Sequence, residues 1–151
     1  MCVASDKITD GVIAELSDSQ WKVRAKALQD VAAILNEAKF IKPSLGDLPT
    51  ALALRLKKDS NKILVTQTLN ICTTIATAMG PNVKRHVQTL GAEILGCCGD
   101  AKPQLRATAV TCLNTWVEHT KLGPFLENEI LADALKLENP NLRTEVCGCI
   151  S

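Results

Sequence analysis

Residues 17–28 read SDSQWKVRAKAL, a polar turn that runs directly into an amphipathic helical pattern. The frame returns as DSNKILVTQTL over residues 59–69 and as DAKPQLRATAV over residues 100–110. From Asp18 to Asp59, and again from Asp59 to Asp100, the spacing is 41 residues. A fainter copy, LENPNLRTEVC, occupies residues 137–147. This period predicts a repeat protein in which each unit contributes one helical hairpin.

Hydrophobic residues recur at helical spacing on both sides of each polar turn, and no hairpin dipeptide flanked by alternating apolar residues indicates strands. A period of about 40 residues with two helices per unit is typical of HEAT and armadillo repeats. We therefore expect an all-α HEAT-repeat solenoid of stacked antiparallel helical hairpins. The expected helices span residues 6–17, 20–38, 47–58, 61–79, 81–97, 103–119 and 125–137, with an eighth starting near Pro140.

Proline and glycine divide these helices into four repeats within one domain, residues 1–151. The repeats cover about residues 6–38, 46–79, 81–119 and 124–151. Asp6, Asp47 and Asn61 each precede a helix and are the expected N-caps. The chain ends at Ser151, inside the second helix of the fourth repeat. We expect an incomplete domain whose last hairpin has no capping repeat and associates with another chain or frays.

Composition excludes several classes of function. The net charge is +1, from 17 basic and 16 acidic residues, which argues against bulk binding to nucleic acid or anionic membranes. No apolar run approaches the roughly 18 residues of a membrane span, and the first residues lack the features of a signal peptide. Apolar residues make up 46% of the chain, so a packed core is expected.

The seven cysteines do not form a metal or disulfide pattern. There is no C-x-x-C motif, and adjacent residues such as Cys97 and Cys98 point about 100° apart on a helix. Buried free thiols in a reducing compartment are expected. Motifs for phosphate binding, zinc proteolysis and serine hydrolysis are absent, so we expect no enzymatic activity, no cofactor and no metal.

The repeats place Trp21 at the edge of the stack. We call Asp18, Asp59, Asp100 and Leu137 the anchors of the four repeats. The residues three positions after the anchors are Trp21, Lys62, Pro103 and Pro140. Proline is favoured in the first turn of a helix, so this position begins the second helix of each hairpin. A row of such turns forms a composite binding ridge along a solenoid. Tryptophan and lysines on the ridge suit an acidic protein surface with an apolar notch.

Two tryptophans are expected to behave differently. Trp21 could fold back into the core, but it lies off the apolar stripe of its helix, and we interpret it as an exposed interface anchor. Trp116 lies between Leu113 and Val117 and is expected in the core. Arginines recur six residues after the anchor (Arg24, Arg106 and Arg143), and with the anchor aspartates they predict a structural Asp–Arg ladder between repeats, interrupted at Val65.

Several segments resemble a TOG domain of the ch-TOG/Mini spindles family of microtubule polymerases. They include residues 17–24, residues 38–52 (AKFIKPSLGDLPTAL), residues 78–87 (AMGPNVKRHV) and residues 138–143. The resemblance covers essentially the whole chain and is closer to a later module of the array, such as the fourth, than to the first two. It implies six HEAT repeats, of which the fifth and sixth are absent from this chain of 151 residues.

The resemblance also implies a partner and a site. In that family the intra-repeat turns grip αβ-tubulin, so this chain is expected to bind tubulin or microtubules, support microtubule growth and spindle organisation, and act in the cytoplasm at microtubules, spindle and centrosome. A HEAT scaffold that binds another protein or acts as a spacer is the alternative. The residues that match tubulin-contacting positions are Trp21, Lys22, Asn61, Lys62 and Lys102, with Asn139, Asn141 and Arg143 at the fourth turn.

Overall fold

The computed structural model describes residues 10–37 and 47–121, and within these ranges every regular element is helical. The first hairpin consists of α2 (Asp10–Glu15) and α3 (Trp21–Glu37), and the second of α4 (Leu48–Lys58) and α5 (Lys62–Met79). The third contains η1 (Gly80–His86), η2 (Val87–Gly91), α6 (Ala92–Cys97) and α7 (Pro103–Thr120). The expected all-α fold is confirmed.

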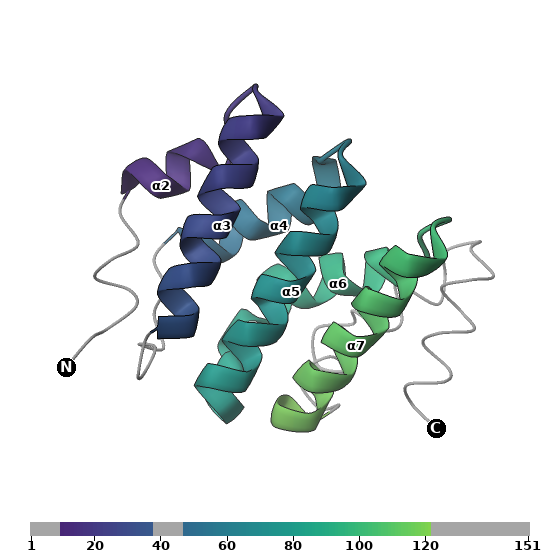
Figure 1. Cartoon of the computed structure of the whole chain (residues 1–151). Helices are drawn as coiled ribbons and strands as arrows, with labels where there is room; N and C mark the ends of the chain where they lie inside the picture. Colours follow the sequence, from purple (N-terminus) through teal and green to yellow (C-terminus); the bar gives the residue numbers. More distant parts are fainter. Residues whose placement is uncertain (1–9, 38–46, 122–151) are drawn as a thin grey trace.

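The helices form two layers. In Figure 1, α3, α5 and α7 lie side by side in the front layer, while α2, α4 and α6 lie behind them. The connections α2–α3, α4–α5 and α6–α7 are all at the upper end of the stack in that view. This is the stacking that a repeat of about 40 residues predicts, and it brings turns 41 residues apart in the sequence to the same edge of the molecule.

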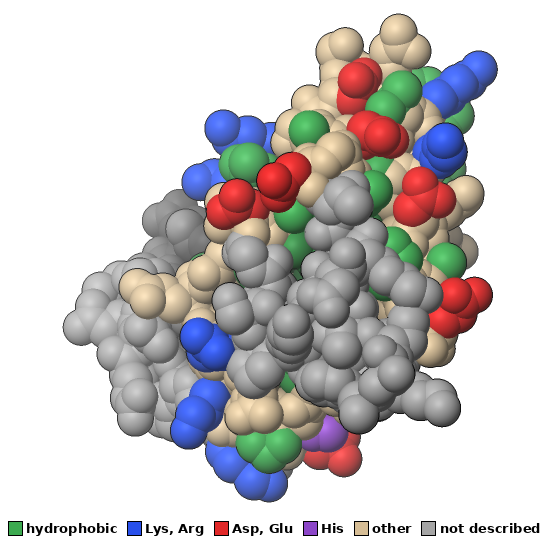
Figure 2. Space-filling model, turned by 90° about the vertical axis from the view of Figure 1, so that its left-hand side faces the viewer, with side chains coloured by type: hydrophobic (Ala, Val, Ile, Leu, Met, Phe, Trp, Pro, Cys, Tyr) green, Lys and Arg blue, Asp and Glu red, His purple; other side chains and the backbone are tan. Residues whose placement is uncertain are grey.

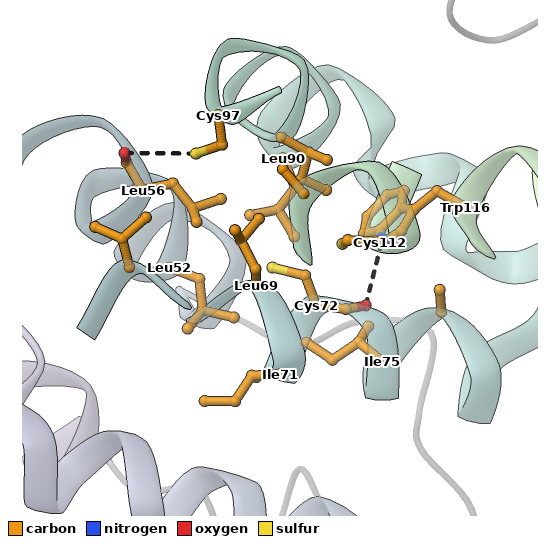
Figure 3. Packing of buried hydrophobic residues seen from close by; sticks show 14 of the residues in the cluster. Leu52, Leu56, Leu69, Ile71, Cys72, Ile75, Leu90, Cys97, Cys112 and Trp116 are labelled. Atoms are coloured by element: carbon orange, nitrogen blue, oxygen red, sulfur yellow. Dashed lines mark hydrogen bonds between the residues drawn. The ribbon is translucent and has the colours of Figure 1, made fainter. Parts of the chain in front are cut away.

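The core is continuous through the three hairpins. It is built mainly of leucine, isoleucine and valine from both layers, and it also contains Trp116, which is fully buried. Figure 3 shows the indole Nε1 of Trp116 donating to the carbonyl oxygen of Cys72, at 3.1 Å, across the contact between α7 and α5. Trp116 is thus a core residue, as its position between Leu113 and Val117 predicted.

Most helix boundaries agree with the sequence pattern to within one or two residues. Asn61 is the N-cap of α5, and its side-chain oxygen accepts from the backbone N–H of Ile63 at 3.0 Å. Asp47 precedes α4, but its side chain makes no capping hydrogen bond, so that expectation was wrong. The reason is local: Asp47 has φ −88° and ψ 0°, in the helical region and not in the extended region typical of an N-cap, and Pro49, the second helical residue, has no N–H to donate.

The expected single helix over residues 81–97 was also wrong. The chain instead runs through a 3₁₀ segment (η1), a π segment (η2) and only then the short α-helix α6. Gly80 turns the chain at φ +61°, Pro81 offers no N–H, and Gly91 favours helix weakly. The tight 3₁₀ turn and the wide π turn together keep Val83, Val87 and Ile94 buried.

Residues Lys62–Cys97 form the one described stretch whose length and mean hydropathy of 1.2 meet the criteria for a membrane span. Half of its most apolar window is buried inside the protein, and the helix is interrupted at Gly80. A core helix of a repeat stack has this composition because it is covered on several sides. The expected helices at residues 125–137 and from Pro140, and with them the whole fourth repeat, lie outside the described residues.

Candidate functional site: the turn ridge

Three turns at one edge of the stack form what we call the turn ridge, residues 18–22, 59–63 and 100–104. Each turn is closed by its anchor aspartate, whose Oδ1 accepts from the backbone N–H two residues later. The three bonds, 2.8, 2.9 and 2.9 Å long, end on Gln20, Asn61 and Lys102. This is an Asx-turn repeated three times. The repeated turn gives the following helix the same start in each hairpin.

An arginine six residues after the anchor supports the first and third turns. Arg24 Nη1 donates to the carbonyl oxygens of Asp18 and Ser19, at 2.8 and 3.2 Å. Arg106 Nη1 makes the corresponding bonds to Asp100 and Ala101, at 3.0 and 3.4 Å. The repeat of the sequence is therefore a repeat of hydrogen bonds as well as of helices.

Asp59 connects the first and second repeats. Its carboxylate receives Arg24 Nε at 3.1 Å and Arg24 Nη2 at 3.3 Å, a bidentate pair, and also Arg55 Nη1 at 3.3 Å. The Asp59 side chain is fully buried. The expected Asp–Arg link between neighbouring repeats is confirmed by Arg24 and Asp59. Arg55 belongs to the same repeat as Asp59 and adds a second arginine to the carboxylate.

The second and third repeats are joined by a different pair. Lys62 Nζ lies 2.8 Å from Asp100 Oδ2. The second repeat has Val65 where the first and third have an arginine, and Lys62 makes the ion pair in its place. Burial acts to raise the pKa of Asp100, but hydrogen bonds from the Lys62 side chain and the Lys102 backbone outweigh it and hold this pKa below the ordinary value. Lys62 therefore has a structural partner within the protein. Its side chain remains 41% exposed, so the ammonium group can also face a partner.

Two large apolar side chains are exposed among the described residues, and both lie on the ridge. Trp21 is 51% exposed and Ile63 is 70% exposed. Lys22 Nζ lies 5.9 Å from the centroid of the Trp21 ring, within the range of a cation–π contact. The expected exposure of Trp21 is confirmed. Exposed aromatic and aliphatic side chains at an edge are typical of interface anchors.

Ile63 was missed by the reading of the sequence. The buried stripe of α5 runs through Leu64, Thr68, Ile71 and Ile75, and Ile63 lies off it. That offset, read in the frame of the repeat, could have identified an apolar residue left in solvent beside Lys62.

A shallow groove of about 290 Å³ lies between the second and third turns. Its walls come from the starts of α5 and α7, and the residues that line it are Lys62, Ile63, Thr66, Lys102, Pro103, Gln104 and Leu105. Ile63 supplies an exposed apolar side chain to this groove, and Lys62 and Lys102 supply positive charge. Such a groove fits an acidic protein surface that carries an apolar side chain.

Two lysines of the ridge face solvent, whereas two of its aspartates are held inside the protein by ion pairs. Lys22 and Lys102 are exposed, and so are Lys57 and Lys58 at the end of α4, next to the second turn. Asp59 and Asp100 are each held in an ion pair. Figure 2, which looks on the first-repeat end, shows acidic and basic side chains interspersed, so no single sign of charge covers that face. Positive charge at the ridge is thus a local feature of a nearly neutral protein.

The described residues contain no cluster of three or more His, Cys, Asp or Glu able to hold a metal ion. Cys72, Cys97 and Cys112 are buried free cysteines, as expected, and Cys98 is also buried. Cys2, Cys147 and Cys149 lie outside the described ranges. Burial raises the pKa of Cys97 and of Cys112 to about 12, and it also raises that of Cys72. A thiol with so high a pKa is a poor nucleophile at neutral pH.

The structure brings five of the eight candidate residues together on the ridge: Trp21, Lys22, Asn61, Lys62 and Lys102. Asn61 is the N-cap of α5, so part of its amide is already engaged. The remaining candidates, Asn139, Asn141 and Arg143, fall outside the described residues.

Comparison with known proteins gives relatives in several organisms, while a search of protein-family models gives no match. The chain is 44% identical to protein mini spindles of Drosophila melanogaster over 140 residues. It is 39% identical to protein MOR1 of Oryza sativa over 120 residues and 37% identical to centrosomal protein 224 of Dictyostelium discoideum over 116 residues. These matches cover 93%, 78% and 76% of this chain, but only 7%, 6% and 6% of the relatives.

Solved structures share the fold. One, from work on microtubule plus-end tracking by XMAP215, CLIP-170 and EB1, superposes with a TM-score of 0.85 at 19% identity, over 96% of this chain and 60% of that chain. Another, from work on tubulin recruitment by microtubule polymerases with TOG domain arrays, gives 0.84 at 21% identity, over 98% and 31%. With the sequence identity to mini spindles and MOR1, these likenesses establish that the chain belongs to the mini spindles/XMAP215 family and folds as a TOG-type domain.

Proposed function

We propose that this chain is a tubulin-binding module that holds αβ-tubulin through the turn ridge and supports microtubule growth, in the cytoplasm at microtubules, spindle and centrosome. The names of its relatives, mini spindles and centrosomal protein 224, support the setting. One structural neighbour comes from work on tubulin recruitment by microtubule polymerases, which supports the partner. The chain spans only 7% of mini spindles and 6% of MOR1, the relatives that it matches.

The observation that carries the proposal is the exposed pair Trp21 and Ile63 on one edge, surrounded by lysines. An exposed tryptophan at a rigid turn offers a large contact area, because its turn is already fixed by Asp18 and Arg24. The lysines supply attraction to an acidic partner and guide its approach. We include Ile63 in the proposed site with Trp21, Lys22, Asn61, Lys62 and Lys102, and we extend it to Asn139, Asn141 and Arg143 at the fourth turn.

The test is a binding measurement with αβ-tubulin. Trp21→Glu is expected to weaken binding by roughly 30-fold or more, the effect of losing an interface hot spot. Ala33→Glu adds the same charge to an exposed position of α3, about three turns away from the ridge, and is expected to bind like wild type. Equal affinities for wild type and Trp21→Glu would overturn the ridge as the site and favour a HEAT scaffold that binds another protein.

A further inference from the structure

We propose that Ser60 is a phosphorylation site for a protein kinase that recognises basic residues, and that the phosphate switches the turn ridge off. The second half of this proposal rests on the proposed binding of tubulin. Ser60 lies at the centre of the ridge, in the turn between α4 and α5, and its side chain is exposed.

The backbone around Ser60 is suited to a kinase active site. Asp59 has φ −71° and ψ 125°, and Asn61 has φ −88° and ψ 106°, so the residues on both sides of the serine are already extended. A longer extended segment requires the last turn of α4, with its Arg55–Asp59 pair, and the first turn of α5 to open, and helix ends fray readily.

Lys57 and Lys58 provide the recognition charge. They stand three and two residues before Ser60, and both are exposed. Many serine kinases select substrates by charge pattern and place acidic pockets where such residues arrive. In the folded protein both lysines lie in the last turn of α4, within three residues of Ser60.

The other turns act as internal controls. Ser19 occupies the same position of the first turn and is also exposed, but Leu16 and Ser17 stand where the second turn has lysines. The third turn has Ala101 there and offers no hydroxyl. Among the three described turns, only the second combines a serine with two preceding lysines.

The reaction is an ordinary phosphoryl transfer from ATP. Ser60 Oγ forms a bond to the γ-phosphorus while the bond from that phosphorus to the β,γ-bridging oxygen breaks, and ADP leaves with the electron pair. The hydroxyl proton passes to the catalytic base of the kinase. The product adds a charge of about −1.5 to −2 at neutral pH.

The new charge affects binding more than folding. The phosphate would lie immediately before the N-terminus of α5, where a helix favours negative charge. It would also lie within three residues of Lys62 and Ile63, in the part of the ridge with the most exposed apolar side chain. A phosphate there repels an acidic partner, and the water that it binds weakens the apolar contact made by Ile63.

The experiment treats the whole chain with ATP and the catalytic subunit of a cAMP-dependent protein kinase, and maps phosphate by mass spectrometry. We expect phosphate on Ser60, none on Ser19, and a rate at least about tenfold lower after combined Lys57→Ala and Lys58→Ala substitution. Ser19→Ala is the matched control and should not change incorporation. Absence of phosphate on Ser60, or equal modification of Ser19, would overturn the assignment.

Tubulin binding then tests the switch. Phosphorylated protein is expected to bind roughly tenfold more weakly than untreated protein, whereas Ser60→Ala, treated identically, keeps its affinity. Circular dichroism should show unchanged helicity. Unchanged affinity of the Ser60 phosphoprotein, in a preparation where Trp21→Glu abolishes binding, would overturn the switch and leave the tubulin site standing. If Trp21→Glu also binds normally, the proposed function is what fails.

Discussion

The two junctions between the described repeats are linked at the ridge in different ways. At the first, Arg24 and Arg55 both bind the fully buried carboxylate of Asp59. At the second, Lys62 binds Asp100, and the two side chains are 41% and 15% exposed. The first link is therefore a buried structural element, whereas the second uses a side chain that also belongs to the proposed binding surface.

Away from the ridge, the second junction is the more tightly packed of the two. The first junction leaves a hollow of about 220 Å³ between α3 and α5, and Gln67 Oε1 at its wall is buried without a hydrogen-bond partner. The second junction is packed by Trp116, which is fully buried and hydrogen-bonded to Cys72. Each junction is thus tight at a different place: the first at the ion pairs, the second in the core.

The largest expected effect comes from Asp59→Ala at the first junction. It leaves two guanidinium groups, Arg24 and Arg55, without their shared counter-ion, and breaking a buried pair in this way costs about 3–5 kcal/mol. Urea unfolding followed by circular dichroism measures the change. Asp100→Ala, which removes the partly exposed partner at the second junction, is the control and should cost clearly less. Equal losses for the two variants would show that the junctions do not differ as described.

Trp116→Phe tests the core of the second junction. The variant loses the bond to the Cys72 carbonyl and leaves a small cavity, so we expect a loss of about 1–3 kcal/mol in the free energy of unfolding. Trp21→Phe is the matched control on a ridge tryptophan that is half exposed, and should change stability by less than about 0.5 kcal/mol. If Trp116→Phe were as stable as wild type, the packing of the second junction would not depend on this residue.

Much of this contrast could be predicted from the sequence, because equivalent positions in successive repeats show where each helix begins. Pro103 at the frame position of Trp21 placed that tryptophan at a helix start, and the position of Trp116 within an apolar stripe placed it in the core. The Asp–Arg spacing predicted a link between repeats, and Arg24 with Asp59 confirms it. These features depend on local periodicity, which a single sequence contains.

The rest depends on contacts between repeats. Nothing local shows that Lys62 reaches Asp100, 38 residues away. The 3₁₀ and π segments before α6 were missed because their residues keep the buried spacing of an α-helix, while the chain path is set by Gly80 and by packing. Ile63 was missed because an apolar side chain is ordinarily expected in the core, although its offset from the buried stripe of α5 could have identified it.

A smaller effect should appear on acidification. The pKa of Asp100 is lower in the folded protein, so its ion pair stabilises the fold above the ordinary carboxyl value of 3.8 and is lost as the pH falls through the lower folded value. Because the pair is partly exposed, we expect this contribution to be less than about 1 kcal/mol. In urea unfolding between pH 7 and pH 3, the difference in stability between wild type and Asp100→Asn should stay constant down to about pH 3.8 and shrink below it. A constant difference across that range would argue against the link between Lys62 and Asp100.

The smallest effect is expected for Lys62→Met, which keeps most of the aliphatic stem and removes the ammonium group. Exposed ion pairs contribute little, so we expect a loss of at most about 0.5 kcal/mol at pH 7 in low salt. In about 1 M NaCl the difference should nearly vanish, because the screening length falls to roughly 3 Å. Tubulin binding should nevertheless weaken, since the charge also belongs to the proposed site. A loss of stability as large as that of Asp59→Ala would instead make Lys62 a structural residue, and the second junction would then resemble the first.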